Sequence, residues 1–129
     1  MQAKRVIIHV GTYKTGSSSL QNLLFANRET LLKNGILFPM SGLRTATPQL
    51  GIRHTDLIYD HTRKHRPLLP VSLQEELEDT DFHTVIFSSE AWSNWTHISP
   101  LTRFVCELED LGYQEIECVV VFRNVSEYA

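Results

Sequence analysis

The stretch that decides the fold is residues 6–24, VIIHVGTYKTGSSSLQNLL. Its apolar, β-branched beginning predicts a buried strand that ends at Gly11, and the serines after Gly16 open an apolar-periodic segment that predicts a helix. A helix that starts at the carboxyl end of a strand binds anions, because its first amides lack intrahelical acceptors and its dipole adds roughly half a positive charge there. We therefore expect a phosphate or sulfate group to bind at this connection.

The residue types in the connection suit an oxyanion. Gly16 permits close approach of the backbone, and Lys14 supplies a mobile point charge. Hydroxyl groups that can donate to oxyanions belong to Thr15, Ser17, Ser18 and Ser19. The alternative is an ordinary strand-to-helix connection in which Ser17 or Ser18 caps the helix.

The spacing of these residues differs from the familiar nucleotide-binding loop. That loop has glycine, four residues, then Gly-Lys-Ser/Thr, whereas here Ser17 follows Gly16 and the lysine lies inside the loop at Lys14. Lys-Thr-Gly-Ser-Ser-Ser after a strand resembles the 5′-phosphosulfate-binding loop of sulfotransferases that use 3′-phosphoadenylyl sulfate (PAPS). The longer string HVGTYKTGSSSLQNLLFANRETLLKNGILFP, residues 9–39, is similar to the N-terminal segment of bacterial sulfotransferase-family proteins.

The resemblance implies a P-loop NTPase-like fold, PAPS as the sulfuryl donor, adenosine 3′,5′-bisphosphate (PAP) as a product, and no metal. It implies that residues 14–19 bind the cofactor and that Lys14 stabilises charge on the leaving oxygen. In this family an arginine just after a later strand holds the cofactor's 3′-phosphate, and Arg123 matches it. The family's accompanying serine would fall beyond Ala129, so we expect the chain to be an N-terminal portion.

The composition bounds the class of protein. With 129 residues, 42% of them hydrophobic and 21% charged, we expect one globular, partial domain over residues 1–129. A net charge of −3 gives no overall attraction to nucleic acid or to an anionic membrane, so the expected partner is a small-molecule or carbohydrate acceptor. No leader peptide and no apolar run of about 18 residues is present, from which we expect a cytoplasmic protein. Cys106 and Cys118 are expected to be free, buried thiols.

The remaining pattern predicts a three-layer α/β/α fold with a parallel sheet. In the first helix the leucines are expected to face the sheet and Gln21 to face water, up to a stop at Asn34-Gly35. A segment of Ser, Gly, Thr and Pro from Met40 to Gly51 predicts a surface loop, which would contribute to acceptor choice. The expected strands are 5–10, 84–87 and 116–122, with a short extended segment at 36–38, and the later helices are 54–61, 72–79 and 99–111.

Two charged residues follow the predicted strands at their carboxyl ends. Ligands collect beside these ends in open parallel sheets, so Glu90 and Arg123 should share an edge with Lys14. Glu90 is the candidate base that takes the acceptor proton, or alternatively a carboxylate in the first turn of the next helix. Trp92 and Trp95 follow it as an apolar wall or, as we prefer, as core residues.

The sequence leaves two functions other than sulfuryl transfer open. A P-loop nucleotide kinase or NTPase predicts a lysine after Gly16 and an acidic magnesium ligand, for which only Glu90 could serve. A non-catalytic nucleotide-bisphosphate-binding module is the third possibility. His61 and His65 have metal-compatible spacing, but Pro67 soon breaks the helix. His9 is expected to be a hydrogen-bonded residue near the strand end, and residues 63–66 to be a solvated basic loop rather than a surface for an acidic acceptor.

Overall fold

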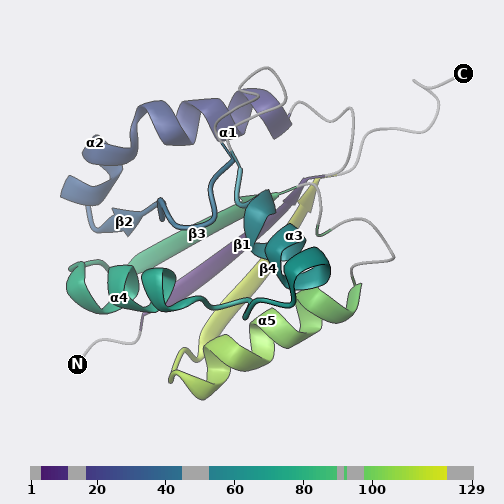
Figure 1. The fold of residues 1–129 in the computed structure, drawn as a ribbon. Coiled ribbons are helices and arrows are strands. Elements are labelled where there is room, and N and C mark those ends of the chain that lie inside the picture. The colour runs from purple at the N-terminus through teal and green to yellow at the C-terminus, as the bar shows by residue number, and fades with distance from the viewer. Residues whose placement is uncertain (1–3, 12–16, 45–52, 90–91, 93–97, 122–129) are drawn as a thin grey trace, which may run out of the picture.

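The structure, a computed structural model, describes residues 4–11, 17–44, 53–89, 92 and 98–121. Within these residues, the strands form one parallel sheet, as predicted, and their order in the sheet is β2-β3-β1-β4 (Figure 1). The strands are β1 (Arg5–Gly11), β2 (Ile36–Leu37), β3 (Thr84–Ser89) and β4 (Glu115–Val121).

The first strand lies in the middle of this sheet. Val10 of β1 pairs with Ser89 of β3, and Gly11 of β1 pairs with Val121 of β4. The carboxyl ends of the three strands therefore lie side by side. The short β2 is at the edge, where Pro39 soon ends it because proline has no backbone donor for a ladder.

Helices cover both faces of the sheet. Figure 1 shows α1 (Ser17–Ala26) and α2 (Arg28–Lys33) on one face, and α3 (Thr55–Lys64), α4 (Val71–Asp79) and α5 (Ile98–Asp110) on the other. The chain thus leaves β1 for one face and the neighbouring β3 for the opposite face. Among the described helices, none combines the length and apolar character needed to cross a bilayer.

The apolar core lies on the α3–α5 face. Val6, Ile8 and Val10 of β1 point to this face and are at most 4% exposed. Phe104 of α5 packs between Phe87 and Trp92, with ring centroids 5.0 and 5.1 Å away. Burial of such side chains contributes about 1.5 to 3 kcal/mol each before entropy. The expectation that Trp92 is a core residue is confirmed, and Trp95 lies outside the described residues.

The predicted first helix is instead two helices. The break is at Asn27, whose backbone has φ −103° and ψ 15°. The side-chain amide of Asn27 donates to the Leu23 carbonyl oxygen over 2.8 Å. Such local side-chain bonds compete with the helical ladder. Gly35 has φ +82°, as the predicted stop requires.

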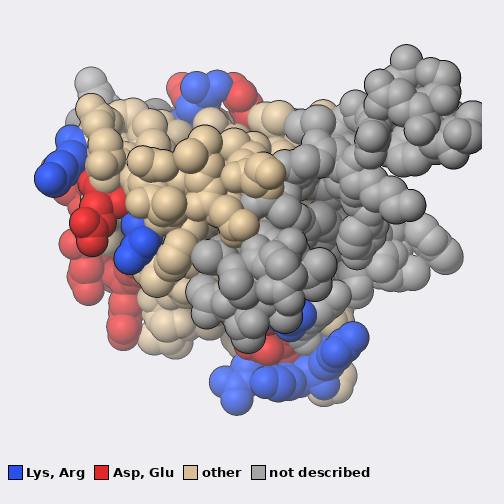
Figure 2. Space-filling view, turned by 90° about the horizontal axis from the view of Figure 1, so that it is seen from above, with Lys and Arg blue, Asp and Glu red and all other residues tan. Residues whose placement is uncertain are grey.

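The prediction that the leucines of this segment face the sheet is wrong for three of them. Leu20, Leu23 and Leu32 are 40%, 60% and 38% exposed. Figure 2, seen from the side of α1 and α2, shows uncharged residues in the middle of the described surface and charged residues towards its edges. The outer surface of α1 and α2 is therefore partly apolar.

The cysteines are free, as expected, but they are exposed rather than buried. Cys118 lies on β4, which is at the edge of the sheet that the described residues form. Val119 and Val120 beside it are 41% and 40% exposed. An apolar run does not distinguish an edge strand from a central one.

The aromatic contacts of Phe104 predict a large loss of stability when its ring is removed. Phe104→Ala leaves a cavity between Phe87 and Trp92 and should lower the free energy of unfolding by about 3 to 5 kcal/mol. Urea unfolding measures this loss. Leu111→Ala, a truncation of a side chain that is 49% exposed, is the control and should cost less than about 1 kcal/mol. Equal losses in the two variants would contradict the assigned core.

Candidate anion-binding site

The two elements that flank the predicted anion loop have the predicted boundaries. β1 ends at Gly11, and α1 begins at Ser17. Ser17 and Ser18 belong to the first turn of α1, and Ser19 is exposed there. The other predicted site residues lie outside the described residues: Lys14, Thr15, Gly16, Glu90 and Arg123.

The structure brings together the strand ends from which those residues continue. Glu90 follows Ser89, the last residue of β3, and Arg123 is the second residue after Val121, the last residue of β4. Both strands pair with β1 at these ends. The sequence prediction that the three segments start from one edge of the sheet is confirmed for the strands themselves.

A buried polar cluster lies at this edge, on the α1 side of the sheet. The Ser88 hydroxyl is 2.7 Å from His9 Nδ1, and it accepts a hydrogen bond from Gln21 Nε2 over 2.9 Å. Ser88 and Gln21 are fully buried, and His9 is 5% exposed. The expectation of a hydrogen-bonded His9 is confirmed, whereas the prediction that Gln21 faces water is wrong.

The direction of Gln21 follows from its partner. Of the α1 residues whose burial is described, Gln21 alone is buried, while Leu20 and Leu23 point outward. Ser88 lies beside His9 in the β1–β3 register, so both offer polar atoms to the face that α1 covers. A buried hydroxyl needs a partner, and Gln21 supplies it. Polar residues inside the apolar runs of β1 and β3 were the sequence signal for this cluster.

His54, which the sequence analysis did not single out as a site residue, connects the same edge to α3. The Ser88 N–H donates to His54 Nδ1 over 2.9 Å, and His54 Nε2–H donates to the Pro39 carbonyl oxygen over 2.8 Å. A backbone N–H can only donate, so Nδ1 carries no proton and the ring is neutral. Burial lowers the pKa of His54 to about 4, and the bond from Nε2–H to the Pro39 carbonyl oxygen opposes that shift.

Burial also lowers the pKa of His9. Its ring is therefore neutral at pH 7. Two side-chain atoms of the cluster, His9 Nε2 and Gln21 Oε1, have no hydrogen-bond partner among the described residues.

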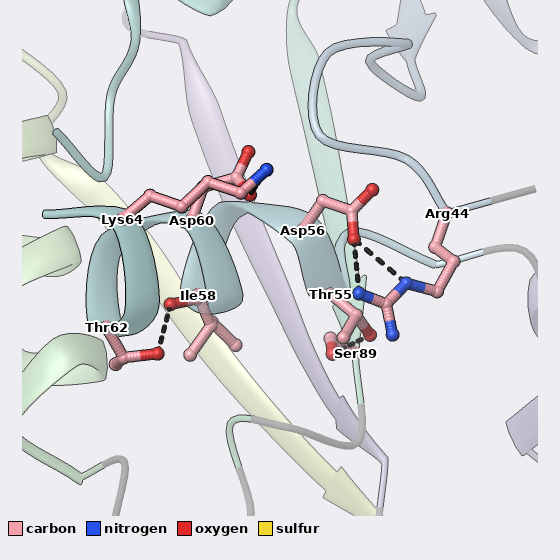
Figure 3. Close-up of polar contacts among 8 residues, drawn as sticks. All are labelled: Arg44, Thr55, Asp56, Ile58, Asp60, Thr62, Lys64 and Ser89. Atoms are coloured by element: carbon pink, nitrogen blue, oxygen red, sulfur yellow. Dashed lines mark hydrogen bonds and ion pairs between the residues drawn. The ribbon is translucent and has the colours of Figure 1, made fainter. Parts of the chain in front are cut away.

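Side-chain contacts fix the start of α3 at the end of β3. Figure 3 shows the Thr55 hydroxyl against that of Ser89, 2.7 Å away, and Arg44 paired with Asp56. Arg44 Nε and its terminal nitrogen lie 2.9 and 2.7 Å from one carboxylate oxygen of Asp56. The backbones of Arg44 and Arg53 also form an antiparallel bridge. Segment 45–52, which contains the second half of the predicted surface loop, lies outside the described residues, but both of its flanks are held beside the sheet's carboxyl edge.

The two histidines with metal-compatible spacing do not come together as ligands. His61 Nδ1 bonds to the Arg66 carbonyl oxygen over 2.8 Å, and His65 ends α3 in a left-handed conformation with φ 56°. Within the described part of the chain, no three His, Cys, Asp or Glu residues are grouped as a metal site requires. The basic residues 63–66 are exposed at the end of α3, where Lys64 pairs with Asp60 at 3.6 Å.

A groove of about 460 Å³ lies at the opposite, amino edge of the sheet, between Lys4, Lys33 and His83. The predicted anion loop joins β1 to α1 at the carboxyl edge, so this groove is not part of the candidate site.

Comparisons with known proteins give no assignment. No protein-family model, curated protein or solved structure matches this chain.

Neutral His54 makes stability depend on pH. Its pKa is about 4 when folded and 6.5 in the reference state, so between these values the unfolded chain binds more protons. The stabilisation is fully present above pH 6.5 and is lost as pH falls towards 4, with a total on the order of 3 kcal/mol. Urea unfolding from pH 7 to pH 4 measures it. His54→Asn, which does not titrate, should lose less stability over this range, and equal slopes would refute the assignment.

Proposed function

We propose that this protein is a PAPS-dependent sulfotransferase with a P-loop NTPase-like fold, which transfers a sulfuryl group to the hydroxyl or amine of a small-molecule or carbohydrate acceptor. One observation carries the proposal. Residues 12–16, with Lys14 before Gly16 and serines after it, connect the carboxyl end of the central parallel strand to the N-terminus of a ten-residue helix. That order of lysine, glycine and serines is the feature shared with the phosphosulfate loop of sulfotransferases.

The topology supports a ligand at this edge. In open α/β sheets, ligands bind beyond the carboxyl ends of neighbouring strands whose connections leave to opposite faces. β1 and β3 are such a pair, because β1 leads to α1 and β3 leads to α5 on the other side (Figure 1). The first amides of α1 then supply donors for an anion without any metal.

The proposed reaction needs in-line geometry and charge stabilisation more than covalent chemistry. The acceptor oxygen or nitrogen forms a bond to sulfur as the bond from sulfur to the bridging phosphate oxygen breaks. Lys14 stabilises the negative charge that develops on that leaving oxygen. Glu90 takes the acceptor proton, and Arg123 holds the 3′-phosphate through a bidentate interaction.

The two rival functions bind different ligands. A nucleotide kinase or NTPase would prefer ATP with magnesium, while a non-catalytic module would bind PAP without turnover. The presence of Ser17 in place of the lysine after Gly16 argues against the kinase.

The first test is ligand choice combined with removal of the lysine. Calorimetric titration of the full-length protein should show tighter binding of PAP than of ATP with magnesium. Lys14→Ala should lower the rate of sulfuryl transfer from PAPS by about 100-fold or more, because it removes charge stabilisation in the transition state. Lys33→Ala, a change of an exposed lysine on α2, is the control and should be neutral. Tighter, magnesium-dependent ATP binding would refute the proposal.

The second test concerns Arg123 and the 3′-phosphate. Arg123→Ala should weaken the binding of PAPS by about 10- to 100-fold, which is the equivalent of one charge-assisted hydrogen-bonded pair. The binding of adenosine 5′-phosphosulfate, which has no 3′-phosphate, should change little. Competition binding measures both ligands on wild type and variant. If the variant loses affinity equally for the two ligands, the assignment of Arg123 to the 3′-phosphate is wrong.

A further inference from the structure

The polar cluster of His9, Gln21 and Ser88 contains more hydrogen-bonding capacity than its members use. The Ser88 hydroxyl oxygen accepts from Gln21 Nε2, so the hydroxyl hydrogen is available for His9 Nδ1, 2.7 Å away. A neutral ring that accepts at Nδ1 carries its hydrogen on Nε2. The two atoms without a described partner are then one donor, His9 Nε2–H, and one acceptor, Gln21 Oε1.

This pair of atoms is chemically complementary to water. Buried polar atoms in native proteins rarely remain unpartnered, and water is the common partner when donors and acceptors face the same space. His9 and Gln21 both bond to the same Ser88 oxygen, so the two unpartnered atoms belong to the same buried cluster. A water molecule can accept from the ring and donate to the amide.

The cluster joins the elements that flank the anion loop. His9 lies two residues before the end of β1, and Gln21 lies four residues after the start of α1. Gln21 is also the one side chain of α1 described as buried, so its hydrogen bonds set how the helix lies on β1 and β3. The direction of the first α1 amides depends on that placement.

We propose that His9, Gln21 and Ser88, together with an ordered water held between His9 Nε2 and Gln21 Oε1, position the N-terminus of α1 for anion binding. His9 is thus a positioning residue of the anion site, and this inference rests on the proposed function. Ser88 holds the His9 ring through a hydrogen bond at Nδ1, and His9 Nε2 positions the N-terminus of α1 through the water.

Substitution of His9 by asparagine or by glutamine separates the roles of the two ring nitrogens. The asparagine amide oxygen can replace Nδ1 as the acceptor of the Ser88 hydroxyl hydrogen, whereas the glutamine amide nitrogen can replace Nε2–H as the donor. Calorimetry with PAP and with inorganic pyrophosphate should show that His9→Asn binds about tenfold more weakly than wild type, the equivalent of one buried hydrogen bond. His9→Gln should stay within about threefold of wild type.

His83→Asn is the matched control. His83 Nδ1 also bonds to a hydroxyl, Thr84 Oγ1 at 2.8 Å, but at the amino edge of the sheet. This variant should bind both anions as wild type does. Urea unfolding of every variant separates loss of stability from loss of affinity. Unchanged affinity of His9→Asn, or an equal loss in His83→Asn, would overturn the proposal.

Nitrogen NMR of the wild-type protein provides a measurement that needs no variant. The His9 ring should carry its hydrogen on Nε2, slow to exchange with solvent, and this signal should shift when either anion binds. A hydrogen on Nδ1, or a signal that the anion leaves unchanged, would refute the inference. Binding of pyrophosphate without PAP would refute the proposed function alone, and wild type that binds neither anion would refute both.

Discussion

The hydrogen bonds of Ser88 are the constraint on which the carboxyl edge of the sheet depends. Its hydroxyl bonds to His9 of β1 and Gln21 of α1, and its backbone N–H and C=O bond to the ring and the backbone N–H of His54. One fully buried residue thus links β3 to β1, α1 and the start of α3. A buried polar group without a partner costs about 1 to 3 kcal/mol, so loss of one of these partners destabilises the contacts of the others.

The central position of β1 explains why the candidate anion site is expected at this edge of the sheet. A strand with parallel neighbours on both sides is buried on both faces, which accounts for its apolar run. Its carboxyl end is then flanked by the carboxyl ends of β3 and β4. Segments that are far apart in the sequence therefore begin at neighbouring strand ends. The same topology sends α1 and α5 to opposite faces of the sheet.

The sequence predicted the strand boundaries better than it predicted which residues of the first helix face the sheet. Gly11 and Ser17 were placed correctly because turn chemistry and helix caps are local. The exposure of Leu23 and the burial of Gln21 were not, since the helical period identifies two faces without showing which one meets the sheet. His54 was missed for a related reason: its partners, Pro39 and Ser88, are distant in sequence. The adjacency of the strand ends could be predicted, and the buried hydrogen bonds between these elements could not.

The different construction of the two faces suits the proposed site. On the α3–α5 face, apolar packing supplies stability, and such packing is non-directional. On the α1 face, Leu20, Leu23 and Leu32 are exposed, and a buried hydrogen bond from Gln21 to Ser88 joins α1 to β3, where Ser88 also bonds to His9 of β1. Hydrogen bonds weaken steeply away from linear geometry, so they fix an angle as well as a distance. A helix whose terminal amides must point at an anion needs that angular control more than it needs additional buried area.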